Sequence, residues 1–579
     1  MWITPNRFRW SCFVLALMTA SVALFSRLDF LSELDAQQSR TYLRVSDDRL
    51  RNPEPENWLM YRRTYNGWGF SPLNQITSRN VTDLSPVWVF QTGVFNEHHQ
   101  APPIVNDGTM FVTTGSHVIA LDAATGRLLW RYVRQLPADL VTRHPTNRGV
   151  ALYEDKVFVG TLDAHVVALD ATTGTLMWEQ SVEDYRRGYY VTMAPLVVEG
   201  KVLVGTSGGE QGIRGFVTAL DVVTGEELWR TYTVPSPGEA GSETWPGETW
   251  RTGAGPVWLT GHYDPNLRLT YWGTGNPGPW MGDRRSGDNL YTNSTVAVDV
   301  DTGAMRGHHQ YHWNGSWDWD EANAPLLIDI ERGGRSISAL IHAGRNGYLW
   351  FLERSESQIS FVEGKPFVHN NVFSELDAQT GRPQYNARHI PQTGRQVDFC
   401  PSVGGGKNWQ PEAFSPLTRL LYIPANNNLC SSMEGQDVVY EPGRGYAGAD
   451  FITYTRDQAD HIGELQAWNV DSGKRIWTRN FLSGNGGSIL VTGGNVLFLG
   501  GAGKSAFEAF DAVTGQPLWR LPTNTDRFGV PTSYSVDGVQ YVAVQSGATI
   551  LPTDTMQAVS RPSGPQDGLV WVFALDCQC

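Results

Sequence analysis

The stretch Val118-Ile-Ala-Leu-Asp-Ala-Ala-Thr-Gly-Arg-Leu-Leu-Trp130 decides the fold, because the same phrase recurs along most of the chain. The phrase combines Ala, an apolar residue and Asp, then Thr-Gly after two further residues, and Trp four positions after the glycine. Close copies lie at 166–178, 217–229 and 507–519, and degenerate copies lie at 465–477, at 295–305 without the tryptophan, and around 376–381. Repetition of this kind is typical of proteins built from repeated structural units.

Each copy predicts one hairpin of a β-sheet. An alternating strand ends in Asp-x-x-Thr-Gly, whose glycine supplies the positive φ of a tight turn, and an apolar strand returns. Because a hairpin cannot bury both of its faces alone, repeated sheets must stack around an axis, with the recurrent tryptophan as a plug between neighbours. We therefore predict an all-β fold, an eight-bladed β-propeller over residues 57–579 with ~65 residues per blade and tryptophan-docking repeats. An open array of sandwiches is the alternative.

Two similar tetrapeptides near the ends of the chain, Val87-Trp-Val-Phe90 and Val570-Trp-Val-Phe573, are expected to pair in the sheet that closes the ring. The composition suits an all-β protein, since the 579 residues include 61 glycines for turns and 22 tryptophans for packing. The net charge of −14 argues against nucleic acid as a partner, because phosphate binding requires a basic surface. The same charge would steer a basic electron acceptor favourably.

Residues 1–30 are predicted to be a targeting segment, because Arg7 and Arg9 precede an apolar run over 12–25. This run is shorter than the ~20 residues that a membrane-spanning helix needs, which favours a cleaved signal peptide over a permanent anchor. Either form places the protein in the periplasm, free or attached to the outer face of the inner membrane. Residues 31–56 are expected to be a linker.

The segment His312-Trp-Asn-Gly-Ser-Trp-Asp-Trp-Asp-Glu321 carries the clearest chemical signal. If this segment is extended, Asp318 and Asp320 point to one side while Trp317 and Trp319 point to the other. Two neighbouring carboxylates repel each other unless a cation lies between them. The pair therefore indicates a metal site, with a solvated turn as the alternative.

Two glycine-rich tracts offer further ligands. In 205–215, Glu210 follows a pair of glycines whose backbone N–H groups can approach an anion closely. In 271–279, Asn276 offers an amide oxygen. Glycines in either tract also suit ordinary turns.

With these motifs in this order, the chain resembles the PQQ-dependent alcohol dehydrogenases of the methanol/ethanol type over essentially its whole mature length. The resemblance implies that Glu210, Asn276 and Asp318 bind the metal, that Asp318 is the catalytic base, and that Arg345 donates to the quinone oxygens. It also implies that Trp258 lies flat beneath the quinone and that Cys400 pairs with Cys430 in a disulfide. The further cofactor contacts that it implies are Gln100, Arg148, Thr192, Ser207, Gly208, Gly209 and Asn408.

This sequence departs from the family pattern above the quinone. Thr142-Arg143 replaces the two adjacent cysteines of the methanol group, Gln100 replaces a glutamate, and Asn485 replaces a tryptophan. These replacements imply that the side of the site above the quinone is more open and more polar than in the methanol group, which argues against methanol as the preferred substrate. The sequence has no Cys-x-x-Cys-His haem motif, so we expect a separate cytochrome c-type electron acceptor.

Asp320 bears on the choice of metal. Calcium members of the family have a small or uncharged residue two positions after the base, whereas lanthanide-dependent members have an aspartate. Glu210, Asp318 and Asp320 would supply three formal negative charges together with the oxygen of Asn276, which suits a trivalent ion. We therefore expect a lanthanide(III) ion, with Ca²⁺ as the alternative.

The resemblance implies oxidation of a small alcohol to an aldehyde or ketone, with hydride transfer to the metal-polarised quinone. A polyol or sugar dehydrogenase and a non-catalytic propeller that serves as an interaction platform are the alternatives. Gly503-Lys504-Ser505 does not complete a phosphate loop, because Phe498 stands where that motif requires glycine. His308, His309 and His312 do not have the spacing of a zinc site.

Overall fold

The first copy of the repeated phrase forms a hairpin, as predicted. Strand β6 (His117–Asp122) pairs antiparallel with β7 (Leu128–Val133), and Gly126 between them has a φ of 74°. The carboxylate of Asp122 accepts hydrogen bonds from the backbone N–H and the hydroxyl of Thr125, at 3.0 and 2.9 Å. The aspartate thus fixes the turn that the glycine makes possible.

The computed structural model describes residues 42–95, 97–502, 505–523, 525–547 and 567–576. The predicted targeting segment, most of the predicted linker, and Cys577 and Cys579 lie outside these residues. From Arg44 onward the described chain forms one compact unit. None of the helices in the described ranges has the length and apolarity that crossing a bilayer requires.

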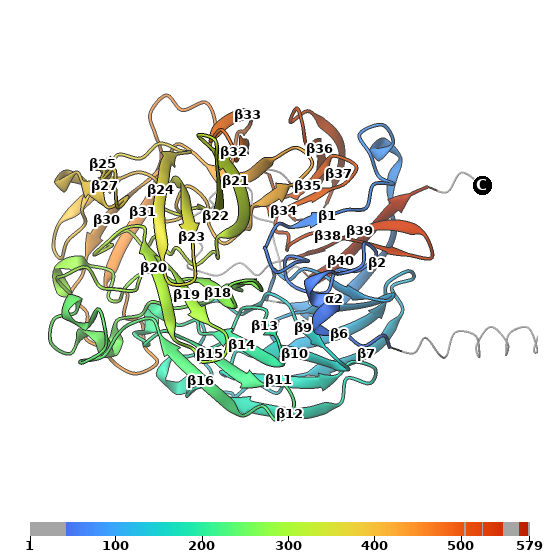
Figure 1. Ribbon diagram of the computed structural model, residues 1–579, viewed down its shortest axis with the longest axis horizontal. Helices are drawn as coiled ribbons and strands as arrows, with labels where there is room; N and C mark the ends of the chain where they lie inside the picture. Colours follow the sequence, from blue (N-terminus) through green and yellow to red (C-terminus); the bar gives the residue numbers. More distant parts are fainter. Residues whose placement is uncertain (1–41, 96, 503–504, 524, 548–566, 577–579) are drawn as a thin grey trace, which may run out of the picture. The chain divides into compact units, whose positions relative to one another are not determined.

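Eight sheets, antiparallel except for one short parallel edge strand, surround a common centre in the described part of the chain (Figure 1). The first four are β4 (Ile104–Asn106), β5 (Thr109–Thr113), β6 and β7; β9 (Ala151–Tyr153), β10 (Lys156–Gly160), β11 (His165–Asp170) and β12 (Leu176–Ser181); β13 (Leu196–Val198), β14 (Lys201–Gly205), β15 (Phe216–Asp221) and β16 (Glu227–Tyr232); and β17 (His262–Asp264), β18 (Leu269–Gly273), β19 (Ser294–Asp299) and β20 (Met305–Gln310). The other four are β21 (Leu326–Arg332), β22 (Arg335–Ala343), β23 (Tyr348–Arg354) and β24 (Ile359–Pro366); β28 (Ala413–Ser415), β29 (Leu420–Asn426), β32 (Gly463–Asn469) and β33 (Lys474–Phe481); β34 (Ile489–Thr492), β35 (Val496–Gly500), β36 (Ala506–Asp511) and β37 (Pro517–Pro522), with β1 (Phe70–Ser71) added; and β38 (Thr532–Val536), β39 (Val539–Ser546), β40 (Asp567–Leu575) and β2 (Leu84–Phe95). The predicted eight-bladed propeller is confirmed.

Smaller elements lie between the blades. The strands are β3 (His98–His99) with β8 (Thr146–Asn147), β25 (Phe373–Leu376) with β26 (Pro383–Tyr385), and β27 (Gln396–Phe399) with β30 (Leu429–Gly435) and β31 (Ala449–Thr455). The helices are α2 (Asp47–Arg51) and the 3₁₀ turns η1 (Val81–Asp83), η2 (Tyr185–Arg187), η3 (Gly209–Gln211), η4 (Ser242–Thr244), η5 (Thr249–Thr252), η6 (Gly282–Arg284) and η7 (Ala387–His389).

The ring closes through the two tetrapeptides that the sequence singled out. Strand β2 pairs antiparallel with β40, with Trp88 opposite Val572 and Phe90 opposite Val570. The last blade is therefore built from both ends of the propeller, and this pairing is confirmed.

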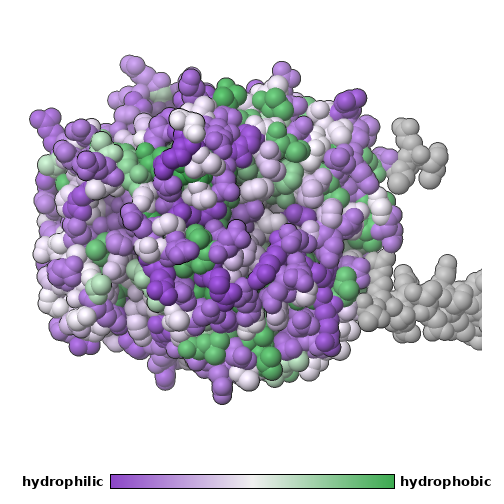
Figure 2. Space-filling model, viewed as in Figure 1, coloured by the Kyte–Doolittle hydropathy of each residue, from purple (hydrophilic) through white to green (hydrophobic). Residues whose placement is uncertain are grey.

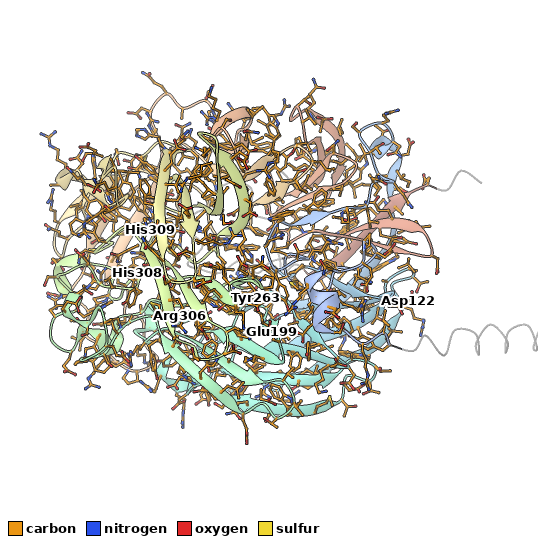
Figure 3. The ribbon with its side chains drawn as sticks, in the orientation of Figure 1. Asp122, Glu199, Tyr263, Arg306, His308 and His309 are labelled. Carbon is orange, nitrogen blue, oxygen red and sulfur yellow. A yellow bond between two sulfur atoms is a disulfide. The ribbon has the colours of Figure 1, made fainter. Side chains whose placement is uncertain are left out.

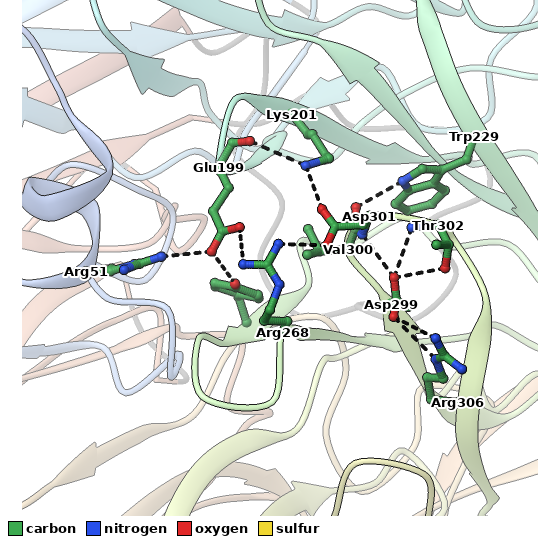
Figure 4. A network of polar contacts seen from close by, with 11 residues as sticks. Arg51, Glu199, Lys201, Trp229, Arg268, Asp299, Val300, Asp301, Thr302 and Arg306 are labelled. Carbon is green, nitrogen blue, oxygen red and sulfur yellow. Dashed lines mark hydrogen bonds and ion pairs between the residues drawn. The ribbon is translucent and has the colours of Figure 1, made fainter.

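The recurrent tryptophan joins each of several blades to the next one. The indole N–H of Trp130 donates to the carbonyl oxygen of Ala171 at 3.0 Å, and its ring lies on Gly174. A Cβ added to Gly174 would stand 2.5 Å from that ring. Trp229 repeats the arrangement with the carbonyl of Val300 at 3.0 Å (Figure 4).

In other blades a different side chain donates to the equivalent carbonyl oxygen, which belongs to the residue after the Asp or Asn of the repeated phrase. The hydroxyl of Tyr534 donates to the carbonyl of Ala123 at 2.7 Å, and that of Tyr422 donates to Ala512 at 3.0 Å. The guanidinium of Arg332 donates to Val470 at 3.0 Å. The constraint is therefore a donor for this carbonyl, which a tyrosine or an arginine also meets.

The segment 57–69 ties the innermost strands together. Trp58 exchanges backbone hydrogen bonds with Val105 of β4, both at 2.9 Å. Carbonyl oxygens of Tyr65, Asn66, Trp68 and Gly69 then accept hydrogen bonds from backbone N–H groups of the inner strands, whose donors are Tyr263, Leu327, Phe414 and Val491. One short segment thus satisfies inner-strand backbone groups of five blades. Just before it, the described part of the predicted linker includes α2.

One degenerate copy of the phrase lies outside the eight blades. The copy around 376–381 forms the hairpin β25–β26, whereas the β23–β24 hairpin of the fifth blade carries no copy of the phrase.

Cys400 and Cys430 form a disulfide with their Cα atoms 4.4 Å apart, which confirms the predicted pair.

The two ends of a blade differ in their surroundings. In Figure 3, Asp122 in the outer turn of the first blade lies near the periphery, whereas Tyr263 on the inner strand β17 lies nearer the centre.

Figure 2 shows that the visible face is largely hydrophilic, with apolar residues in small separate groups. Exposed apolar side chains include Leu128 on β7 and Met177 on β12.

We expect Gly174→Ala to destabilise the protein more than Gly538→Ala. Both glycines have a positive φ, 71° and 80°, which costs an alanine ~1–2 kcal/mol. Nothing lies within 4 Å of a Cβ added to Gly538, whereas one added to Gly174 overlaps Trp130 and should cost roughly 1–3 kcal/mol more. Urea unfolding of the two variants measures this, and equal losses would show that the indole–glycine contact does not hold the blades together.

Candidate functional site

The predicted cofactor-binding residues lie mostly in the loops that lead into the innermost strands. These strands begin at the same end of the ring, so side chains far apart in sequence converge there. Residues in such positions are Gln100 before β4, Arg148 before β9, Thr192 before β13, Trp258 before β17, Asp320 before β21 and Asn408 before β28.

Asp318 and Asp320 lie on one side, but not because the segment is extended. Asp318 has a φ of 60°, in the left-handed region, so the extended backbone that we expected is wrong at this residue. Trp317 and Trp319 stack on each other, with ring centroids 5.1 Å apart, and are almost fully buried. The left-handed residue lets both indoles pack in the core while both carboxylates face Arg345, at 3.6 and 3.2 Å.

Asp320 is held by three groups that were predicted to belong to the site. Its carboxylate accepts hydrogen bonds from the backbone N–H of Asn276 at 2.6 Å, from the indole N–H of Trp258 at 3.1 Å and from Arg345 at 3.2 Å. Burial raises the pKa of Asp320 to about 6, although Arg345 and these hydrogen bonds lower it. The side chain links the two predicted ligand loops to the predicted aromatic floor.

The carboxylate of Asp318 has fewer hydrogen-bond donors around it than the carboxylate of Asp320. One carboxylate oxygen is 3.6 Å from Arg345, and the other is buried with no hydrogen-bond partner among the described residues. Burial raises the pKa of Asp318 well above its usual range, and the charges of Asp320 and Glu210 raise it further against Arg345. In the absence of a cation, burial and the neighbouring carboxylates therefore disfavour the charged form of Asp318.

Glu210 lies in η3 beside this pair, where its backbone carbonyl oxygen accepts a hydrogen bond from Tyr446 at 2.6 Å. A Cβ on Gly208 would stand 2.1 Å from a carbonyl oxygen of Gly188, and one on Gly209 would stand 2.9 Å from Pro256. The two glycines are therefore required by packing within the chain. Among the described residues, no group of three or more His, Cys, Asp or Glu side chains is arranged so that it could hold a metal ion.

Glu321 supports Arg345, and the sequence argument did not assign it a role. This fully buried carboxylate accepts the backbone N–H groups of Arg345 and Asn346 at 2.9 and 3.1 Å, and a ring nitrogen of His342 lies 2.7 Å away. Its position directly after Asp320 was the available signal. Glu321 fixes the loop that presents the guanidinium to both aspartates.

Arg148 is a buried cation without an acidic partner among the described residues. Its guanidinium donates to the hydroxyl of Thr192 at 2.6 Å and lies 4.8 Å from the ring centre of Trp258 and 5.5 Å from that of Trp409. The hydroxyl of Thr192 is 2.9 Å from that of Ser207. Burial lowers the pKa of Arg148 to about 10. A buried positive charge between two indoles fits an anionic, flat ligand.

Gln100 and Asn408, two further predicted cofactor contacts, differ in whether their side-chain amides are hydrogen-bonded within the chain. The amide oxygen of Gln100 is buried and has no hydrogen-bond partner among the described residues. Asn408, in contrast, donates to the carbonyl of Gly404 at 3.3 Å and accepts from the N–H of Trp409 at 2.8 Å, so it shapes its own loop. Asn485 likewise donates to the carbonyl of Glu464 at 2.9 Å.

The arrangement fits a charged, planar ligand together with a hard cation. Buried polar groups normally find partners within a protein, and an unsatisfied one needs an explanation. Among the predicted site residues, four buried side-chain atoms lack a hydrogen-bond partner in the described chain, namely the amide oxygen of Gln100, Nε of Arg148, one oxygen of Asp318 and Nε of Arg345. They include donors and acceptors of the kinds that an anionic ring and a metal-bound substrate require.

Comparison with known proteins gives a consistent result. Residues 58–383 and 461–542 match the PQQ glucose/ethanol/alcohol dehydrogenase β-propeller domain. The quinoprotein alcohol dehydrogenase PedH of Pseudomonas putida is 35% identical over 562 residues, covering 92% of this chain and 93% of PedH. The lanthanide-dependent methanol dehydrogenase of Methylacidiphilum fumariolicum is 35% identical over 545 residues, covering 88% of each chain. The solved structure of a europium-containing methanol dehydrogenase superposes with a TM-score of 0.85 at 34% identity, covering 91% of this chain and 100% of that one.

Metal-free protein should be stabilised by Asp318→Asn at pH 8. A carboxyl whose pKa is raised on folding loses stability as the pH rises, because the folded state then holds an unfavourable charge. The variant should melt roughly 2 °C or more above the wild type at pH 8, and the two should converge below pH 4. Calorimetry across this range, with the exposed Asp457→Asn as control, tests it. A lower melting temperature at pH 8 would mean that Asp318 is adequately compensated without metal.

Proposed function

The chain belongs to the PQQ-dependent alcohol dehydrogenase family, and on this premise we propose that it oxidises an alcohol to an aldehyde or ketone at Asp318. The observation that carries the proposal is the buried carboxylate oxygen of Asp318, which has no hydrogen-bond partner among the described residues. That oxygen lies in a site with Arg345 and Asp320, and it can accept the hydroxyl proton of a substrate once a bound cation lowers the pKa of Asp318.

The residues of the chain divide the work of binding and catalysis. When bound beside a metal ion, PQQ supplies an electrophilic carbonyl that accepts hydride from the alcohol carbon. Asp318 takes the hydroxyl proton, and Arg345 supplies N–H groups and positive charge next to it. The ring of Trp258 offers a flat surface, and its indole N–H is held in place by Asp320. Arg148 supplies the charge that an anionic rim requires.

The cofactors are PQQ and a lanthanide(III) ion, with Ca²⁺ as the alternative. Glu210, Asn276, Asp318 and Asp320 would hold the metal through hard oxygen donors, and three of the four carry a formal negative charge. The effect of Asp320 and Glu210 on the pKa of Asp318 supports a highly charged ion, because a trivalent cation offsets the repulsion among three carboxylates more fully than a divalent one.

Electrons leave to a separate cytochrome c-type acceptor in the periplasm. The sequence contains no Cys-x-x-Cys-His motif, and its net charge of −14 favours encounter with a basic carrier. Residues 1–30 would direct export and, if retained, attach the enzyme to the membrane. Activity in a periplasmic fraction supports this part of the proposal, and activity confined to the cytosol contradicts it.

Asp318→Asn should abolish turnover by protein reconstituted with PQQ and lanthanum. An amide cannot accept the substrate proton, and loss of a general base typically costs at least ~10²-fold in rate. Dye-linked alcohol oxidation measures turnover, while absorbance of bound PQQ reports whether the cofactor is retained. Asp457→Asn is the matched control. Wild-type turnover by Asp318→Asn with bound PQQ would exclude Asp318 as the base.

Asp320→Ala should lower lanthanide affinity by roughly tenfold or more, because it removes one of three anionic donors. Titration of metal-free protein with Eu³⁺, followed by luminescence, measures this without catalysis, and activity with La³⁺ or Ca²⁺ gives a second readout. The wild type should be more active with La³⁺. Full wild-type activity with Ca²⁺, together with no loss of affinity or activity in Asp320→Ala, would refute the lanthanide assignment while leaving the family assignment intact.

A further inference from the structure

Arg143 stands at one of the positions where this sequence departs from the family pattern, and the loop that carries it lies beside a predicted metal ligand. The side-chain amide of Gln211, the residue after Glu210, donates to the carbonyl oxygen of Val141 at 3.4 Å. The same amide donates to the carbonyl oxygen of Gly443 at 3.1 Å. Gln211 therefore joins two loops, one around Arg143 and one around Gly443, at the edge of the site.

The side chain of Arg143 lies against the second of these loops. A Cβ added to Gly445 would stand 2.5 Å from Nη2 of Arg143, so the guanidinium packs directly on this glycine. The next residue, Tyr446, donates its backbone N–H to the carbonyl oxygen of Glu210 at 2.6 Å. Arg143 is thus one residue removed from a direct contact with the backbone of Glu210.

The charge of Arg143 is available to a ligand. The side chain is exposed, and no acidic side chain in the described ranges forms an ion pair with it. Arg345 and Arg148, in contrast, are buried. Arg143 is therefore an exposed cation beside a site in which Arg148 and Arg345 are buried.

We propose that Arg143 binds an anionic group of the substrate, so that the enzyme prefers alcohols that carry a carboxylate over neutral alcohols of the same length. The proposal rests on the proposed function, because the substrate hydroxyl must be at Asp318. A hydroxyl held there leaves the remainder of the molecule to extend outward, where an exposed guanidinium offers two parallel N–H groups to a carboxylate. The cofactor's own carboxylates have a separate buried cation in Arg148.

The neighbouring loop carries a second unpaired positive charge in the described part of the chain. Arg444, next to Gly445 in sequence, is also exposed and has no ion pair with another described residue. Arg186 and Arg187, in contrast, pair with Asp184 and Glu183 at 2.9 Å each and are already neutralised.

Comparison of butan-1-ol with 4-hydroxybutanoate tests the proposal in holoenzyme reconstituted with PQQ and lanthanum. The wild type should have the higher kcat/KM for 4-hydroxybutanoate. Arg143→Gln should reduce this value about tenfold through KM, with a much smaller change for butan-1-ol, and Arg143→Glu should reduce it further. Arg131→Gln, which removes an exposed charge on β7, is the matched control and should change neither substrate.

Inhibition by butanoate and binding of PQQ give readouts that do not depend on substrate turnover of the hydroxy acid. Butanoate should compete with butan-1-ol in the wild type and lose affinity in Arg143→Gln. Equal effects of Arg143→Gln on both alcohols, or no effect, would overturn the proposal. Weakened PQQ binding in this variant would also overturn it and assign Arg143 to the cofactor. Failure of the wild type to oxidise any alcohol would instead contradict the proposed function.

Discussion

The site depends on the contacts that close the ring of sheets, because its residues come from positions between 100 and 408 and meet only when the blades are in register. At the periphery an indole, a phenol or a guanidinium donates to the same carbonyl of the next blade. At the centre the segment 57–69 bonds to inner strands of five blades. Each loop that enters an inner strand is thereby held at one end of the ring, where its side chains form the site.

This rigid frame allows the site to hold charges that are unfavourable without ligands. Asp318 and Asp320 are buried side by side, and burial raises the pKa of both. Arg148 is buried between two indoles and has no acidic partner among the described residues. Each of these groups lacks what a cation or an anionic ring supplies, so binding of PQQ and metal should also stabilise the fold. In the proposed mechanism, the base is the same carboxylate whose charged form burial disfavours in the metal-free protein.

The repeated phrase made the hairpins predictable, because these depend on local turns and strand alternation, and the spacing of its copies indicated the number of blades. The pairing of β2 with β40 was predictable from the similar tetrapeptides 87–90 and 570–573. The joint location of Asp318 and Asp320 was also predictable, although through an incorrect assumption about the backbone. The left-handed conformation of Asp318 arises because Trp317 and Trp319 both require the core, a tertiary effect that strand periodicity does not contain. The support of Arg345 by Glu321, and the tyrosines that replace an indole, depend on contacts between blades and have no local signature.

A crystal structure of the protein with PQQ and lanthanum, with anomalous diffraction to locate the ion, tests the central claim most directly. The account predicts one strong lanthanide peak coordinated by oxygens of Glu210, Asn276, Asp318 and Asp320, and a planar ring lying on the indole of Trp258 with Arg345 at its edge. A lanthanide peak bound elsewhere, or a ring that does not lie on Trp258, would contradict the account.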